Sequence, residues 1–542
     1  MFIHTPFSCR AALAASCGAL AFAAALGEAH AGNLINTDSL LISTTNYEDT
    51  GVVAGLVAGM TAIPGGTAVS NGNVNTVWNN ASVDSSFGAT SPITIEDLST
   101  TGGPPQVLAT DSLDPSKVMT SFSLKSELGL NIANTAGGFV ATFMGYAPGG
   151  AMFPQNAVGD LDVSNSDTTA YSDPTNPVTQ FYGANYAFNR SVVALNADGT
   201  YSITQTLAYG GNNGRAGVLA PNDLYYTVGN SNNGTAKPPP TQLTTTTGLE
   251  VVTPGSTPNS TMIDPTFQSV PGDKAGKDSN FRGLIYYGGQ LYFSKGSGGN
   301  GIDTVYTVSN PGGQLPTSAT ASAAKISILP GFPTSPAASP GPDYTPFGLF
   351  FANPTTLYVA DEGSGNATDQ TEHAGLEKWT LSNGTWSLDY TLQSGLIGQI
   401  YTPPGWDFTE TTSGLRNLAG RVNDDGTVTL WATTATTSGS GDNGADPNEI
   451  VTINDVLADT SLPAESFSVF DGPELGLRYG GVAYAAPEPS TWEMMLGGFA
   501  GLGLVALRRR KGERALISHK SHRWPALFKW QASGAFFRCE PL

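Results

Sequence analysis

Four arginines occupy similar positions in a recurring segment of this chain, and together their side chains could bind an anion. Only six arginines lie between residues 32 and 485, and four of them stand at the start of a short apolar run that contains glycine: Arg215, Arg282, Arg416 and Arg478. A guanidinium group presents its donors in a fixed fork that fits a carboxylate or a phosphate. If the four segments meet in space, they form a cationic ligand-binding site.

The alternative is that each arginine pairs with an acidic residue of the protein itself. A cluster of buried guanidinium groups without counter-charges would be costly, so internal partners must be considered. The acidic residues that come into question are Asp278, Asp361, Glu362, Asp442 and Asp446. The sequence leaves both interpretations open.

Two oxygen-rich loops are candidates for a calcium site. They are residues 361–366, Asp-Glu-Gly-Ser-Gly-Asn, and residues 441–448, Gly-Asp-Asn-Gly-Ala-Asp-Pro-Asn. Carboxylate and amide oxygens are calcium ligands, but neither loop has the spacing of an EF-hand, and solvated turns are the alternative. Asp442 and Asp446 are the candidate metal ligands. The candidate catalytic carboxylates of a calcium-dependent hydrolase are Asp361, Glu362 and Asp446.

Few residues between 32 and 485 could support other kinds of catalysis. This segment contains a single histidine, His373, which excludes a histidine-cluster metal site, and a Ser-His-Asp triad would have to use that one residue. It contains no cysteine, because Cys9, Cys17 and Cys539 all lie outside it. Thiol catalysis, disulfides and cysteine metal sites are therefore excluded there. Calcium is the one cofactor that the sequence indicates.

The arginines belong to β-hairpins that recur along the chain. In three clear copies an apolar strand leads through turn residues to a second strand that contains Leu-Tyr, and these copies span residues 214–229, 281–296 and 346–361. Weaker copies begin at Gly414 and Gly476. A small or polar turn, an apolar strand, a hairpin and a second strand are typical of the inner half of a β-propeller blade.

We therefore expect an all-β protein, a β-propeller of about six or seven blades. The copies are roughly 60 to 70 residues apart, which suits four strands with insertions. Residues 34–44 are available as the strand that closes the ring, and the arginines would surround the central channel. Residues 236–258 and 330–346, rich in proline, are expected to be surface loops. Two β-sandwich domains are the alternative fold, which would leave the recurring hairpin unexplained.

The charge of the segment between residues 32 and 485 excludes some partners. It holds 14 basic and 39 acidic residues, a net formal charge of −25, whereas the whole chain of 542 residues carries −20. Such a surface repels nucleic acid and anionic lipid and favours solubility and cation binding. Charged residues make up 13% of the chain, against about 25% in typical globular domains. We expect an exported protein with no nucleic-acid partner.

Residues 1–31 have the parts of a secretory signal peptide. Arg10 precedes an Ala- and Leu-rich run over residues 11–26, and Ala29-His30-Ala31 is a small-x-small cleavage site. The mature chain is expected to begin near Gly32. A lipoprotein signal ending at Cys17 is the alternative, but the apolar run continues well past that residue.

The C-terminal region has three physically different parts in a fixed order. Pro487, Glu488 and Pro489 are followed by an apolar run over residues 491–507 and then by Arg508, Arg509, Arg510 and Lys511. The run lies in the lower range for a transmembrane helix, and the basic cluster would remain cytoplasmic. Glu493 near the outer end of this span is a departure from the pattern. Residues 512–542 lack helical periodicity and are expected to be a disordered extension.

This order resembles the PEP-CTERM sorting signal of Gram-negative bacteria, over residues 486–511. In that family a Pro-Glu-Pro motif, one membrane span and a basic cluster direct the protein to the cell envelope, and an exosortase processes the tail. The resemblance implies an exosortase-type partner, attachment to the membrane before processing, and delivery to the outer surface or the extracellular matrix. It also implies bacteria that make exopolysaccharide and biofilm, so a polysaccharide or matrix protein is the expected ligand.

The body, residues 32–485, is similar to a group of exported microbial propeller-like proteins without a named activity. The similarity rests on residues 212–215, 277–283, 295–301 and 420–423. It supports the fold and adds no catalytic residue. We expect a binding or structural protein of the cell surface rather than an enzyme. The alternative is a calcium-dependent propeller hydrolase that acts like a lactonase or a phytase, or on a glycan.

Overall fold

The computed structural model describes most of the chain between residues 33 and 486. The described residues are 33–46, 62–63, 66–67, 90–121, 128–148, 188–206, 208–209, 214–230, 248–272, 279–296, 301–336, 344–363, 365, 373–402, 409–437, 447–474 and 477–486. The predicted signal peptide and the predicted transmembrane span lie outside them. No helix within this part of the chain is long and apolar enough to cross a membrane.

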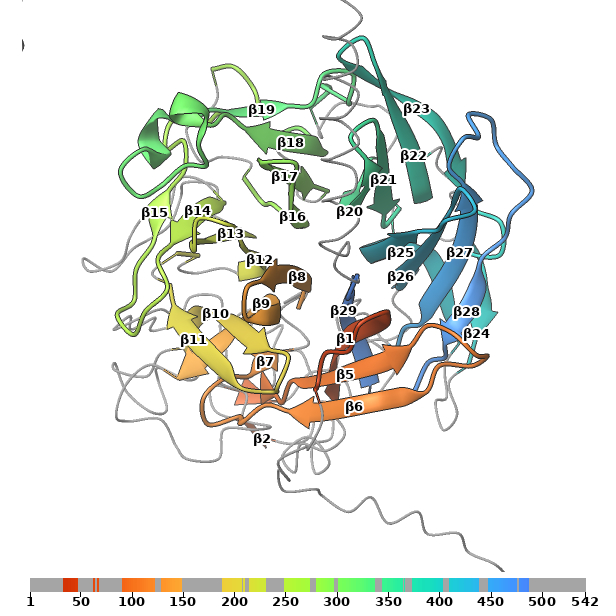
Figure 1. The fold of residues 1–542 in the computed structure, drawn as a ribbon, viewed down its shortest axis with the longest axis horizontal. Coiled ribbons are helices and arrows are strands. Elements are labelled where there is room, and N and C mark those ends of the chain that lie inside the picture. The colour runs from red at the N-terminus through yellow and green to blue at the C-terminus, as the bar shows by residue number, and fades with distance from the viewer. Residues whose placement is uncertain are drawn as a thin grey trace, which may run out of the picture. The chain divides into compact units, whose positions relative to one another are not determined.

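Six antiparallel sheets stand around a common axis as the blades of a β-propeller (Figure 1). In the described residues five of these sheets have four strands and one has five. The expectation of an all-β propeller is confirmed, and the number of blades is six, the lower of the two expected. The inner strands of neighbouring blades contact one another around the ring.

The first three blades each have four strands, which follow one another from the centre of the ring outward. Blade 1 contains β29 (Leu477–Tyr484), β1 (Ser39–Asn46), β5 (Thr94–Ser99) and β6 (Val107–Ser112). Blade 2 contains β8 (Asn131–Thr135), β9 (Gly138–Pro148), β10 (Phe188–Asn196) and β11 (Tyr201–Gln205). Blade 3 contains β12 (Gly214–Leu219), β13 (Tyr225–Gly229), β14 (Leu249–Val252) and β15 (Thr261–Met262).

Blade 4 contains β16 (Leu284–Tyr287), β17 (Gln290–Lys295), β18 (Thr304–Val308) and β19 (Ile326–Ile328). Blade 5 contains β20 (Pro346–Asn353), β21 (Thr356–Asp361), β22 (Gly375–Ser382) and β23 (Thr385–Leu392). Blade 6 contains β24 (Ile400–Tyr401), β25 (Glu410–Val422), β26 (Thr427–Thr437), β27 (Ile450–Val456) and β28 (Ser468–Asp471), and β25 is its inner strand. Short pairs are formed by β2 (Ala62–Ile63) with β3 (Gly66–Thr67) and by β4 (Thr90–Ser91) with β7 (Thr120–Ser121).

Blade 1 closes the ring because it combines strands from both ends of the described chain. β1 pairs antiparallel with β29, from Leu40 opposite Tyr484 to Asn46 opposite Leu477. The predicted closing strand over residues 34–44 is therefore confirmed in β1. The buried Ser43 hydroxyl adds a link to blade 2, since it accepts a hydrogen bond from Gly481 N (2.7 Å) and donates one to Leu128 O (3.0 Å).

The hydrophobic core is divided among the spaces between neighbouring blades. Each of the six interfaces holds its own cluster of buried apolar side chains, and the cluster between blades 3 and 4 is one of the largest. There, Phe281 and Phe293 lie 4.7 Å apart in an edge-on arrangement, and Phe267 contacts Tyr306 edge-on at 5.7 Å. Because a sheet buries both faces only when a blade stands on each side, every blade depends on its two neighbours.

One predicted loop is in part a strand. Residues 249–252, in the proline- and threonine-rich stretch 236–258, form β14, and all four are buried in blade 3. The prediction of a surface loop over this range is therefore wrong for these residues. The short run Leu-Glu-Val-Val has two β-branched residues and pairs with β13 and β15, which outweighs the composition of its surroundings.

The inner strands come closest to one another at a set of small residues, which we call the small-residue ring: Gly129, Ala216, Gly283, Gly348 and Gly481. A Cβ atom on Gly348 would lie 2.5 Å from Arg416 O and 2.7 Å from Leu418 N, so only glycine fits there. In blade 6 the equivalent position is Asn417, whose amide donates to Gly480 O (2.6 Å).

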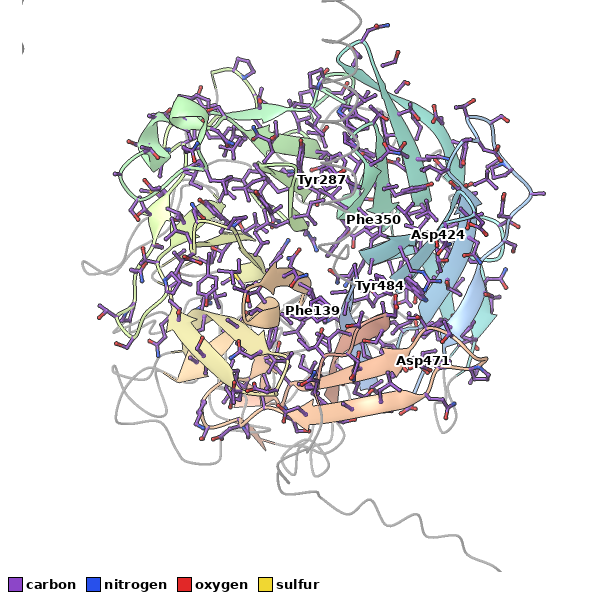
Figure 2. All side chains as sticks on the ribbon, viewed as in Figure 1. Phe139, Tyr287, Phe350, Asp424, Asp471 and Tyr484 are labelled. Carbon is purple, nitrogen blue, oxygen red and sulfur yellow. The ribbon has the colours of Figure 1, made fainter. Side chains whose placement is uncertain are left out.

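A cavity of about 150 Å³ continues from the small-residue ring along the channel, lined by residues of all six inner strands. We call this the exit side, because the inner strands end there, and we call the other side, where they begin, the entrance side. Figure 2 shows Tyr287, Phe350, Tyr484 and Phe139 around the centre of the ring. The channel is therefore narrow at its middle and has a predominantly apolar wall on the exit side.

Gly348 provides a test of this close packing. We expect Gly348→Ala to lower the free energy of unfolding by about 1–3 kcal/mol or more, because the two nearest atoms that the methyl group would meet belong to the backbone. Gly472→Ala is the matched control, since no atom lies within 4 Å of its Cβ position, and it should change stability by less than about 0.5 kcal/mol. Urea denaturation measures both. Equal effects of the two substitutions would contradict the close approach at the ring.

Candidate functional site

The structure places all four predicted arginines on inner strands or directly before one, on the entrance side. Arg215 lies in β12, Arg416 in β25 and Arg478 in β29, while Arg282 lies two residues before β16. Arg215 and Arg282 each directly precede a residue of the small-residue ring, and Arg416 precedes its equivalent Asn417, whereas Arg478 stands three residues before Gly481. A β-bulge lies between Arg478 and the end of β29. Going round the ring, the arginines thus belong to blades 3, 4, 6 and 1.

Arg282 of blade 4 and Arg416 of blade 6 converge on the carboxylate of Glu362, which belongs to blade 5 between them. Arg416 Nε donates to Glu362 Oε2 at 3.2 Å, and Arg282 Nη2 lies 3.9 Å from Glu362 Oε1. Both guanidinium groups also lie near the ring of Phe347, at 5.1 Å for Arg282 and 5.7 Å for Arg416 from its centroid. This set, Arg282, Arg416, Glu362 and Phe347, is called the arginine cluster below.

A second buried ion pair adjoins the arginine cluster. Lys295 Nζ is hydrogen-bonded to Asp303 Oδ1, and Lys295 is fully buried. Burial raises the pKa of Asp303, while Lys295 and Arg282 act in the opposite direction and Glu362 adds to the increase. The five charged groups therefore share one electrostatic environment. Three are cationic and two are anionic, which leaves an excess of one positive charge among them.

The pairing of arginines with internal acids, one of the two interpretations of the sequence, applies to Arg282 and Arg416 through Glu362. Among the other acids considered as partners, Asp278, Asp442 and Asp446 lie outside the described residues. Arg215 and Arg478 are buried, each with 3% of its surface exposed. Arg215 stands in blade 3, next to the blade of Arg282, and Arg478 stands in blade 1, next to the blade of Arg416. The contacts with Glu362 join two of the four predicted arginines, Arg282 and Arg416.

Asp361 faces away from the arginine cluster, although it is the neighbour of Glu362. Its carboxylate accepts hydrogen bonds from Thr345 N (2.7 Å), Thr345 Oγ1 (2.6 Å) and Gly363 N (2.8 Å). Burial, together with the charge of Glu377, raises the pKa of Asp361 to about 7. The structure thus gives Asp361 a role in holding the start of the loop that carries Glu362.

The set of carboxylates required for a calcium-dependent hydrolase is not assembled by the described residues. Asp361 and Glu362 point to different surroundings, and Asp446, the third candidate, is outside the described part of the chain. Within that part, no group of three or more His, Cys, Asp or Glu residues is arranged to hold a metal ion.

A buried histidine and glutamate form a second titratable cluster that the sequence did not reveal. His373 Nδ1 lies 2.5 Å from Glu377 Oε1, and Trp379 Nε1 donates to Glu377 Oε2 at 2.7 Å. The Tyr344 ring packs edge-on against His373 at 4.8 Å. Burial raises the pKa of Glu377, and His373 and Trp379 oppose this increase. The spacing of His373 and Glu377 by four residues was the available signal.

Comparison with known proteins identifies the tail and leaves the body unassigned. Residues 485–511 match the PEP-CTERM protein-sorting motif. The sorting signal predicted from the sequence is therefore confirmed, and it implies an exported protein that an exosortase processes. No curated protein matches the chain.

Solved structures similar to the body include three with low scores. A protein from Bacteroides fragilis, proposed to be a 6-phosphogluconolactonase, has 10% identity and a TM-score of 0.29, covering 82% of this chain and 98% of its own. A glucose dehydrogenase has 13% identity and a TM-score of 0.29, covering 63% and 89%. Apo AztD from Citrobacter koseri has 12% identity and a TM-score of 0.25, covering 73% and 96%. Similarity at this level assigns no activity to the chain.

Raised carboxyl pKa values predict how stability depends on pH. Because the pKa of folded Asp361 is about 7 and that of an ordinary aspartate is 3.8, the folded state keeps a proton that the unfolded state has released between these values. The free energy of unfolding should therefore fall as the pH rises from about 4 to about 7. Other buried or half-buried carboxyls with raised pKa values contribute in the same direction: Glu96, Asp97, Glu250, Asp303, Glu377, Glu449 and Asp471.

Asp361→Asn tests the contribution of one of these groups. The amide is neutral at every pH, so the free energy of unfolding of the variant should decline less than that of the wild type between pH 4 and pH 7. The difference is on the order of 2–4 kcal/mol for a pKa shift of this size. Urea denaturation of both proteins across the pH range measures the difference. Wild-type stability that increases from pH 4 to pH 7, or an unchanged slope in Asp361→Asn, would contradict the raised pKa.

Proposed function

We propose that the protein is an exported binding protein of the cell envelope, whose arginine cluster binds an acidic polysaccharide at the entrance side of the propeller channel. One observation carries the proposal: Arg282 and Arg416, from two different blades, both contact the carboxylate of Glu362. The sorting motif at residues 485–511 supports a partner in the envelope or matrix, because the motif implies export.

Export itself is proposed to use both ends of the chain. Residues 1–31 act as the signal peptide, and residues 491–507 act as the membrane span that holds the protein until an exosortase processes the tail. The body is delivered to the outer surface or the extracellular matrix. In a matrix of exopolysaccharide the abundant polyanions are sugar chains, which favours an acidic glycan as the ligand over a matrix protein.

The charge distribution favours a local anion site on an acidic protein. The body carries a net formal charge of −25, so polyanions are repelled at long range and bind only where cations are concentrated. The arginine cluster and Lys295 supply three cations, which lie in a largely dry environment where charge–charge interactions are stronger than in water. Salt screens the long-range repulsion more than the short contacts, so a specific anion can still bind.

The place where the C-terminal end of the body leaves the ring favours the entrance side as the location of the binding site. β29 begins near Arg478 and ends at Tyr484, and the described chain ends two residues later at Ala486. Six residues of extended strand span roughly 20 Å. The described chain thus leaves the ring on the exit side, whereas Arg282 and Arg416 lie on the entrance side.

Substitution of the two arginines tests the proposal. We expect Arg282→Gln combined with Arg416→Gln to weaken binding to polygalacturonate at least about tenfold, or about 1.4 kcal/mol, since the charge is lost while the side chains stay polar. Affinity electrophoresis or calorimetry at an ionic strength of about 0.15 M, where the long-range repulsion is screened, measures this effect, after circular dichroism has shown that the variant is folded.

Arg421→Gln is the matched control for this experiment. Arg421 also lies in β25 but on the exit side, where its Nε donates to Asn423 Oδ1 (2.8 Å) and its guanidinium lies 5.7 Å from the centroid of the Tyr484 ring. It should bind polygalacturonate like the wild type. Unchanged binding by a folded double variant, or equal losses in the control, would refute the proposed site.

A further inference from the structure

The bridging position of Glu362 indicates how the proposed site is regulated. Its two carboxylate oxygens are directed at different arginines, one at 3.2 Å and one at 3.9 Å. The longer distance exceeds that of a hydrogen bond, so Glu362 forms the fork-like double contact with neither guanidinium group. A carboxylate already stands where the proposed function places the ligand.

We propose that Glu362 is a built-in competitor, whose side chain must leave the space between Arg282 and Arg416 before a ligand carboxylate can enter. This inference rests on the proposed function and specifies it: the ligand is a sugar that bears a carboxylate, a uronic acid unit of an acidic polysaccharide. The resident group is itself a carboxylate, and a ligand of the same shape and charge can replace it on the same two arginines.

The backbone of Glu362 is held in place, so the exchange requires movement of the side chain alone. Glu362 N donates to Thr345 O (3.1 Å), and Ser413 Oγ donates to Glu362 O (3.2 Å). Gly363 has a φ of 72°, and a Cβ atom there would lie 2.4 Å from Ser413 O, which fits only glycine at this close contact. Rotation about the side-chain bonds of Glu362 is the remaining freedom.

Exposure of the charged groups indicates the direction of that rotation. The Glu362 side chain is 15% exposed, whereas the side chains of Arg282 and Arg416 are 5% and 8% exposed. Glu362 is therefore the member of the cluster closest to solvent, and it can turn outward and be hydrated while the arginines stay in place. The aliphatic and aromatic contacts of the arginines, including Phe347, do not have to change.

The charge balance selects a group with one negative charge. With Glu362 in place, Arg282, Arg416 and Lys295 face Glu362 and Asp303. When one ligand carboxylate replaces that of Glu362, the charge of the buried cluster is unchanged, so no additional desolvated charge is created. A dianionic phosphate in place of Glu362 would change this balance by one negative charge.

Two substitutions at Glu362 separate competition from a general effect of charge. Glu362→Gln removes the charge, and Glu362→Asp keeps it on a side chain one methylene shorter, which does not reach both arginines. We expect both variants of the full-length protein, purified in mild detergent, to bind digalacturonate more tightly than the wild type, by about tenfold for Glu362→Gln. Isothermal titration calorimetry measures the affinities, and the methyl ester of digalacturonate should bind to none of the proteins.

The outcomes distinguish this inference from the proposed function. If Glu362→Gln binds more tightly and Glu362→Asp binds like the wild type, the effect is one of net charge, and competition is refuted. If neither variant gains affinity while Arg282→Gln with Arg416→Gln still abolishes binding, the arginine site stands and the competitor role is refuted. If the methyl ester binds as well as the acid, recognition of the carboxylate is refuted.

Discussion

The antiparallel pairing of β1 with β29 is the interaction on which the rest of the structure depends. It places strands from both ends of the described chain in blade 1, and so closes a ring in which every blade has two neighbours. Without it, blade 1 would lack its inner strand and the faces of the adjacent blades would be exposed to water. The closed ring brings the inner strands together at the small-residue ring, where Gly348 touches the backbone of the next inner strand. The entrance side of the channel obtains its geometry from this contact.

The arginine cluster follows from the way in which propeller blades face one another. Side chains on a strand point alternately to the two faces of the sheet, and in a propeller each face is covered by an adjacent blade. Arg282 from blade 4 and Arg416 from blade 6 can therefore both reach Glu362, which follows the second strand of blade 5. The same geometry builds the six apolar clusters between the blades. The charged cluster thus spans two of these interfaces, the one between blades 4 and 5 and the one between blades 5 and 6.

Local patterns allowed much of the fold to be predicted. The Leu-Tyr strands and their turns identified the inner hairpins of three blades, and the apolar run near residue 40 identified the closing strand, because hairpin pairing and strand periodicity are local properties. The number of blades could not be determined in advance, since insertions make the blades unequal in length. β14 was not predicted because it is a strand of four residues within a proline-rich stretch. Its burial depends on pairing with β13 and β15, which the local sequence does not show. The three ordered parts of the tail sufficed to predict the sorting motif.

The candidate site was predicted only in part, for reasons that lie in three-dimensional packing. The common position of Arg215, Arg282 and Arg416 was visible in the sequence, whereas the bulge that separates Arg478 from the end of β29 depends on pairing with β1. The sequence named Glu362 among several acids, and the choice between them is made by contacts between residues more than 50 positions apart. The contact between His373 and Glu377 was not predicted from the sequence. Its one local signal is their separation by four residues, and the burial of both groups depends on the surrounding strands.

A crystal structure of the exported protein grown with digalacturonate tests most directly whether two blades direct Arg282 and Arg416 onto one exchangeable carboxylate. We expect a sugar carboxylate between the two guanidinium groups, the Glu362 side chain turned toward solvent, and the backbone of Glu362 and Gly363 unmoved. A structure with Glu362 still bridging the arginines and the sugar bound elsewhere, or with the two arginines on separate surfaces, would contradict this exchange.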